Sequence, residues 1–221
     1  ALNANFRLGE GKNAEALVRF AVGAPSSEPR SSRREEAHSP SGNRNQSLVT
    51  SAATAQLRAE ALFLLGAWEV LPATVGDLPI KPTKDPNHGA VPTVNPEKWP
   101  GWFDRVVGLY RPLPPRPADA ARRALAPHIA ALVADKDPEV AMAAVEAAVK
   151  LRLTNASPSL LALMRSTSTP VGLRKQIPGA LATLEAAELG EAAKLALADN
   201  DPGIRATALP HLGRLQSDDA V

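Results

Sequence analysis

The sequence predicts an all-α fold, a right-handed α-solenoid of about four helix pairs interrupted by two long insertions. The chain has 221 residues, of which 41 are Ala and 28 are Leu, and both are strong helix formers. Pro138, Pro170 and Pro202 recur at intervals of 32 residues, each preceded by Asp or Thr. A helical stripe of apolar residues follows each of these turns. A period of 20–50 residues built from helix pairs is the signature of a stacked repeat protein.

Each turn is expected to start the second helix of a pair, because Asp and Thr are N-cap residues and Pro suits the first helical position. Shorter first helices are expected at about 119–134, 157–166 and 187–198. The three stripes are offset by 33 and 31 residues, so one turn differs from the others by a residue. Their members are Val140, Ala144, Ala148 and Leu151; Leu173, Ile177, Leu181 and Leu184; and Ile204, Ala208, Leu212 and Leu215.

The N-terminal half contains the same unit in interrupted form. Residues 14–23 match a first helix, and Leu57, Ala61, Leu65 and Trp68 match the stripe of a second helix. Residues 1–9 resemble the second helix of a preceding unit. We therefore expect nine helices, one leading helix and four pairs, in a single repeat domain over residues 1–221 whose most regular part is 118–221.

Two insertions separate these helices. Residues 25–56 are rich in Ser, Arg, Asn and Glu, and we expect them to form a disordered loop. Residues 72–117 contain 11 Pro, which predicts extended structure without a regular helix. Their aromatic part, about 99–113, is expected to pack back on the helices as an ordered loop.

Composition and charge exclude several classes of function. The chain has no Cys, which excludes disulfide scaffolds, Cys-based metal sites and Cys nucleophiles. The net charge of +2 is a weak sign of polyanion binding. No apolar run approaches the roughly 20 residues that span a bilayer. The sequence lacks an initiator Met and begins as if within a helix, so we expect a fragment or a processed product.

The Asp-Pro turns and an Arg early in the second helix make the units similar to HEAT or armadillo-type repeats. The matching residues are Asp137-Pro138, Asp201-Pro202, Arg58, Arg174 and Arg205. In that family the turn Asp and the helix Arg often form a ladder between units. The resemblance covers about 140 helical residues of this chain. Asp201 and Arg205 both fit within one unit, whereas Ala141 replaces Arg in the unit that carries Asp137.

A narrower resemblance involves residues 57–62, Trp68 and 104–113. These strings are similar to a region of heme-binding, sugar-dehydrogenase-like envelope proteins of planctomycetes, in which a HEAT region lies between a propeller domain and a c-type cytochrome domain. The resemblance implies a bacterial periplasmic or cell-envelope location, with cytoplasmic as the alternative. It also implies that any redox site lies outside these residues, since the chain has no Cys-x-x-Cys-His motif.

One aromatic and basic cluster is the candidate docking surface, and it comprises Trp99, Trp102, Tyr110, Arg105 and Arg111. Trp, Tyr and Arg are enriched at binding hot spots. The alternative is that this loop clamps the helices by filling a gap between them. Residues 112–117 are either a rigid spacer or a proline-rich ligand for an SH3-like groove.

Other residue patterns carry no chemical signature. His38, His88, His128 and His211 show no metal-ligand spacing, and Glu185, Glu188 and Glu191 complement a helix dipole. Gly9-Glu10-Gly11-Lys12 is a helix cap and turn rather than a phosphate loop. Pro178 and Pro210 fall inside expected helices, which they should kink.

The sequence therefore predicts a non-catalytic HEAT-repeat scaffold or protein-interaction module without catalytic residues, cofactor or metal. Its expected partner is another protein or a neighbouring domain of the same polypeptide, with no small-molecule substrate and no membrane span. Two alternatives remain open. One is a HEAT spacer of a multidomain heme-binding dehydrogenase-like protein, and the other is a nucleic-acid-binding solenoid, against which the near-neutral repeats argue.

Overall fold

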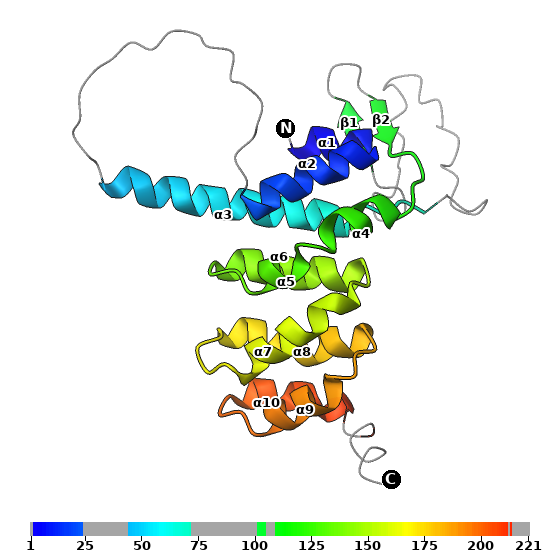
Figure 1. Cartoon of the computed structure of the whole chain (residues 1–221). Coiled ribbons are helices and arrows are strands. Elements are labelled where there is room, and N and C mark those ends of the chain that lie inside the picture. The colour runs from blue at the N-terminus through cyan, green and yellow to red at the C-terminus, as the bar shows by residue number, and fades with distance from the viewer. Residues whose placement is uncertain (1, 24–43, 72–100, 105–108, 212, 214–221) are drawn as a thin grey trace, which may run out of the picture.

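The computed structural model describes residues 2–23, 44–71, 101–104, 109–211 and 213, and it confirms an all-α fold with one small β-hairpin (Figure 1). Ten α-helices and two strands fall within these ranges. The helices are α1 (Leu2–Leu8), α2 (Gly11–Val22), α3 (Arg44–Gly66), α4 (Asp119–Leu125), α5 (Ile129–Val133), α6 (Pro138–Lys150), α7 (Ser157–Arg165), α8 (Val171–Thr183), α9 (Leu189–Leu197) and α10 (Pro202–Ala208). The strands are β1 (Gly101–Asp104) and β2 (Leu109–Pro112), and short 3-10 turns lie at Thr154–Ala156 and Leu209–His211.

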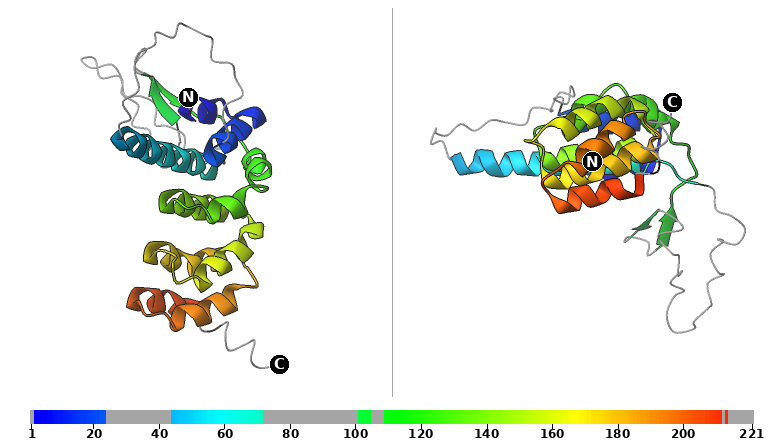
Figure 2. Two further views of the ribbon diagram at one scale, coloured as in Figure 1. Left: turned by 60° about the vertical axis from the view of Figure 1, so that its left-hand side comes forward. Right: turned by 90° about the horizontal axis from the view of Figure 1, so that it is seen from below.

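The helices from α5 to α10 lie in successive layers, in which α5 pairs with α6, α7 with α8, and α9 with α10 (Figures 1 and 2). Contacts run from α3 to α6, α8 and α10 in order. On the other side α2 contacts α4, and α5 contacts α7, which in turn contacts α9. The interior between the rows is built from Ala and Leu with a few Val and Ile. Small Ala side chains let helices approach closely, so the Ala-rich composition fits this layered packing.

The helix starts explain why the apolar stripes are offset by 33 and 31 residues. The Asp137 carboxylate caps α6 by accepting from the N–H groups of Glu139 (2.9 Å) and Val140 (3.4 Å). The Asp201 carboxylate caps α10 in the same way, through the Ile204 N–H at 3.0 Å. In α8, however, Pro170 is itself the N-cap, with an extended ψ of 141°, and the helix begins at Val171. The prediction that Pro170 is the first helical residue was therefore wrong.

Three further prolines lie within or beside the helices, with different effects. The predicted helix 119–134 is two helices, α4 and α5, because Pro127 has no N–H and its ring displaces the carbonyl four residues earlier. Pro178 lies inside α8, as predicted. Pro210 does not, because α10 ends at Ala208 and a 3-10 turn follows.

Helix α3 extends well beyond the predicted stripe. The prediction of a disordered loop was wrong for residues 44–56, which are helical, while 24–43 lie outside the described residues. Adding a residue to an existing helix costs little compared with nucleating one, so the packed half of α3 can propagate towards its N-terminus. Because the helix continues there instead of turning, Leu57 is 48% exposed although the stripe predicts it in the core.

The aromatic part of the second insertion forms the hairpin β1–β2, which stands to one side of the helices (Figure 2). Its antiparallel register pairs Gly101 with Pro112 and Asp104 with Leu109. The described part of 99–113 is thus ordered, as predicted, and none of it is helical. Residues 72–100 and 105–108 lie outside the described part of the chain.

Candidate docking site

Three of the residues predicted to form the docking cluster lie in two neighbouring residue pairs of the hairpin. Trp102 of β1 pairs with Arg111 of β2, and the next pair is Phe103 with Tyr110. Trp102 and Arg111 therefore form one pair of the register, and Tyr110 belongs to the next pair. Trp99 and Arg105, the remaining two candidates, lie outside the described residues.

A different arginine attaches the proline-rich segment to the helices. Arg116 and Val70 exchange two backbone hydrogen bonds of 2.9 Å, which form an isolated β-bridge. The Arg116 side chain donates from Nε to the Trp68 carbonyl (2.7 Å) and from Nη1 to the Phe6 carbonyl (2.6 Å). One side chain therefore joins the N-terminal helix α1, the end of α3 and the residues that follow the hairpin.

Two aromatic rings also contact the Arg116 guanidinium. Its central carbon lies 4.6 Å from the Phe6 ring centre and 4.3 Å from that of Trp68. The two rings meet edge to face at 6.2 Å, and Trp68 is only 1% exposed. Such cation–π contacts are worth about 0.5–2 kcal/mol each. Together, Arg116, Phe6 and Trp68 form what we call the Arg116 clamp.

Burial lowers the pKa of Arg116 from its ordinary value, yet a guanidinium remains protonated in proteins. Its Nη2 is buried without a hydrogen-bond partner among the described residues. The clamp attaches the end of this insertion to the helices through Arg116, which lies outside the aromatic loop for which the clamping alternative was predicted. Sequence reasoning missed it because Phe6 and Trp68 are 110 and 48 residues away; an Arg between two prolines, Pro115 and Pro117, was the available signal.

Two partly buried ion pairs join successive helix pairs. Arg58 of α3 reaches Asp135, before α6, at 2.5 Å, and Arg174 of α8 pairs with Asp199, before α10. In both pairs the arginine side chains are under a fifth exposed, at 18% and 16%. Each arginine also donates to a backbone carbonyl, that of Ala21 in α2 (2.7 Å) for Arg58 and that of Thr169 in the turn before α8 (3.2 Å) for Arg174. We call each such pair a rung.

The rungs use different aspartates from those expected. Asp135 and Asp199 lie two residues before the helix N-caps, and each also accepts the N–H of its N-cap residue, at 3.0 Å and 2.9 Å. The predicted partner Asp201 instead caps α10 and lies 3.4 Å from Lys175. Arg205 donates to the carbonyls of Asp199 and Asn200. The sequence pattern located the arginines correctly but assigned the wrong carboxylates.

Burial works to raise the pKa of Asp135, but the Arg58 side chain and two backbone N–H groups outweigh it. The pKa of Asp135 is therefore lowered from its ordinary value, and the carboxylate is charged at neutral pH. This electrostatic arrangement stabilises a stack of helices and contains no group poised for proton transfer.

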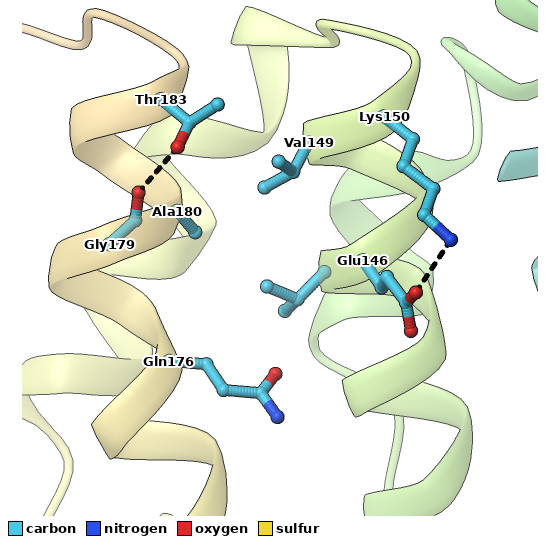
Figure 3. A pocket seen from close by; sticks show the side chains of 8 residues that line it. Glu146, Val149, Lys150, Gln176, Gly179, Ala180 and Thr183 are labelled. Atoms are coloured by element: carbon cyan, nitrogen blue, oxygen red, sulfur yellow. Dashed lines mark hydrogen bonds and ion pairs between the residues drawn. The ribbon is translucent and has the colours of Figure 1, made fainter.

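The interface between α6 and α8 has an open groove instead of a rung (Figure 3). The groove has a volume of about 290 Å³. On one wall Glu146 pairs with Lys150 at 2.7 Å, and on the other the Thr183 hydroxyl donates to the Gly179 carbonyl. A Cβ built on Gly179 would meet nothing within 4 Å, so the groove is open at this glycine.

The remaining candidate residues are dispersed. His128 precedes α5 and His211 ends the last 3-10 turn, while His38 and His88 fall outside the described part of the chain. Glu188 precedes α9 and Glu191 pairs with Arg165 at 2.6 Å. Within the described ranges, no three His, Cys, Asp or Glu side chains gather into a metal site. No helix in those ranges is long and apolar enough to cross a membrane.

Comparison of the chain with protein-family models, with curated proteins and with solved structures finds no match. The class of protein defined so far is an all-α stack of helix pairs with one hairpin insertion, and its function has to be argued from its own geometry.

Proposed function

We propose that this chain is a HEAT-like α-solenoid that acts as a non-catalytic scaffold for protein interaction. The observation that carries the proposal is the repeated rung, in which an arginine of one helix pairs with an aspartate before the next helix of the row that runs from α3 through α6 and α8 to α10. Arg58–Asp135 and Arg174–Asp199 are similar in burial, and each arginine also donates to a backbone carbonyl. Such repetition favours a one-dimensional stack over a single globular core.

The hairpin is the part of this scaffold that we assign to docking. Its strands are only four residues long, and an isolated two-stranded hairpin is marginally stable in water. Trp102, Tyr110 and Arg111 occupy these strands, and Trp, Tyr and Arg are the types that dominate binding energy at interfaces. The Arg116 clamp fixes the point where the hairpin returns to the helices and so limits the entropy lost on binding.

Truncation tests the solenoid part of the proposal. A chain ending after Glu185 lacks α9 and α10 but keeps every earlier pair. Because the stability of a stacked repeat is a sum of nearest-neighbour terms, we expect this chain to retain the helicity of α1 to α8 and to unfold at lower urea concentration. Loss of all cooperative structure on this truncation would contradict a solenoid.

Site-specific photocrosslinking tests the docking part. A photoreactive residue at position 102 or 110 is expected to capture one discrete protein in extracts of the native organism, and Arg111→Ala is expected to weaken that capture. The same reagent at exposed Arg123 of α4 is the control and should capture nothing in common. Equal capture at all three positions, or capture unchanged by Arg111→Ala, would contradict the assignment.

A further inference from the structure

The outer side of α10 and its following 3-10 turn repeats a surface that the preceding helix pairs keep buried. We call this surface the terminal face and define it by Arg205 and Leu209, which are four residues apart and so lie on the same side of a helix. Both residues have equivalents in the earlier long helices, counted from each N-cap. Those equivalents show what normally covers such a surface.

The apolar half of the terminal face is the eighth residue after the N-cap. Val145 at this position of α6 is 2% exposed, and Pro178 at this position of α8 is buried. The stripe alignment gives Leu62 in α3, which is fully buried. Leu209 is the fourth member and is 58% exposed. Three of these four equivalent residues are buried, whereas Leu209 is exposed. This indicates that the position is suited to contact with another helix pair.

The charged half of the terminal face is the fourth residue after the N-cap. Arg174 at this position donates to the carbonyl of Thr169, in its own turn, and its outer nitrogen pairs with Asp199 of the next helix pair. Arg205 makes the inner contacts only, to the carbonyls of Asp199 (3.0 Å) and Asn200 (2.9 Å) in its own turn. Its side chain is exposed, and among the described residues it has no carboxylate partner.

We propose that the terminal face binds a partner helix–turn–helix unit whose turn carries an aspartate two residues before the N-cap of its second helix. Asp135 and Asp199 show why this position suits the role. One carboxylate oxygen accepts the N–H of the N-cap residue, which leaves the other oxygen for an arginine of the neighbouring pair. The partner's apolar turn would cover Leu209 while its aspartate completes a rung with Arg205. This inference rests on the repeat architecture proposed above.

The chain itself supplies the probe for a binding experiment. Residues 186–213 contain α9, the turn with Asp199, and α10, and this unit docks on Arg174 within the protein. A labelled peptide of this sequence is titrated with the full-length chain and followed by fluorescence anisotropy. Because both variants of the chain alter exposed residues, Arg205→Ala and Leu209→Asp should keep the helicity and urea midpoint of the unaltered chain.

We expect saturable binding that weakens roughly tenfold or more in Arg205→Ala and in Leu209→Asp. An Asp199→Asn probe should lose a similar factor with the unaltered chain and little further with Arg205→Ala, because the two changes remove the same contact. Arg123→Ala, at an exposed site on α4, is the matched control and should bind as the unaltered chain does.

Two results overturn the inference. One is the absence of saturable binding at probe concentrations up to about 1 mM, which corresponds to a binding free energy weaker than about −4 kcal/mol. The other is binding that depends on Arg174 and not on Arg205, since the probe would then be displacing α9 and α10 from their own site. Neither result bears on the truncation experiment, so failure of this inference and failure of the solenoid proposal are distinguishable.

Discussion

The Arg174–Asp199 rung should contribute more to stability than any exposed ion pair of the protein. The side chains of Arg174 and Asp199 are 16% and 7% exposed, whereas those of Arg165 and Glu191 are 57% and 49% exposed. Removing one partner of a buried pair costs about 3–5 kcal/mol because the other charge remains buried. An exposed pair is worth about 0–1 kcal/mol.

We expect Arg174→Ala to lower the free energy of unfolding by about 2–3 kcal/mol, below the fully buried limit of that range. The expected loss of stability is smaller than for a fully buried pair because the Asp199 carboxylate still accepts the N–H of Asp201 at 2.9 Å. Arg165→Ala is the matched control and should cost at most about 1 kcal/mol. Urea titration followed by circular dichroism measures both variants, and hydrogen exchange should show α9 and α10 losing protection first.

A double-mutant cycle separates the ion pair from other effects of these substitutions. Asp199→Asn keeps an oxygen that can accept from Asp201 but removes the charge, so Arg174→Ala combined with Asp199→Asn should cost less than the sum of the two changes. We expect a coupling of about 1 kcal/mol or more for a pair in direct contact. If the free energies of unfolding of Arg174→Ala and Arg165→Ala lie within about 0.5 kcal/mol of each other, or if the coupling energy is near zero, the expectation based on burial is refuted.

Two further predictions concern Gly9 and Asp135. Gly9→Ala should lower the melting temperature, because Gly9 has a φ of +70° and a Cβ there would collide with Nη1 of Arg116. Gly11→Ala is the control, since its Cβ would meet nothing within 4 Å, and equal effects of the two changes would contradict this expectation. The lowered pKa of Asp135 means that its contribution to stability is present above its unfolded pKa of about 3.9 and is lost as the pH falls through the lower folded value. Asp135→Asn should therefore reduce the loss of stability measured by urea titration between about pH 4 and pH 2, and an unchanged pH profile would contradict this role.

Local signals in the sequence predicted the helix pairs well because each depends on residues close together in the chain. The Asp-Pro turns located the starts of α6 and α10 through capping, an interaction over three residues. The same turn chemistry failed at Pro170, since Thr169 does not cap the helix and the proline takes the N-cap position. Pro127 divided a predicted helix for an equally local reason, its missing N–H, which the apolar periodicity had concealed.

The contacts between distant segments were not predictable in the same way. The Arg116 clamp depends on one ring in α1 and another that follows α3, and a rung depends on which of two neighbouring aspartates faces the next arginine. Asp199 and Asp201 are both plausible from spacing, and only the direction of the turn makes Asp199 the partner of Arg174 and Asp201 the cap. Sequence alone gives the residue types at an interface, whereas tertiary geometry decides the pairing.

The rung missing between α6 and α8 has a physical explanation that leads to a last prediction. Three parts are absent together: Ala141 replaces the arginine, Ser168 replaces the aspartate, and Pro170 has no N–H to hold that aspartate in place. Adding Ala141→Arg and Ser168→Asp should therefore give weak coupling in a double-mutant cycle, well below that of Arg174 and Asp199. The same cycle in a Pro170→Asp background should give stronger coupling, because the N–H that orients Asp135 and Asp199 in the natural rungs is then restored. Equal coupling in the two backgrounds would show that this N–H does not position the carboxylate, and that the groove between α6 and α8 lacks a rung for another reason.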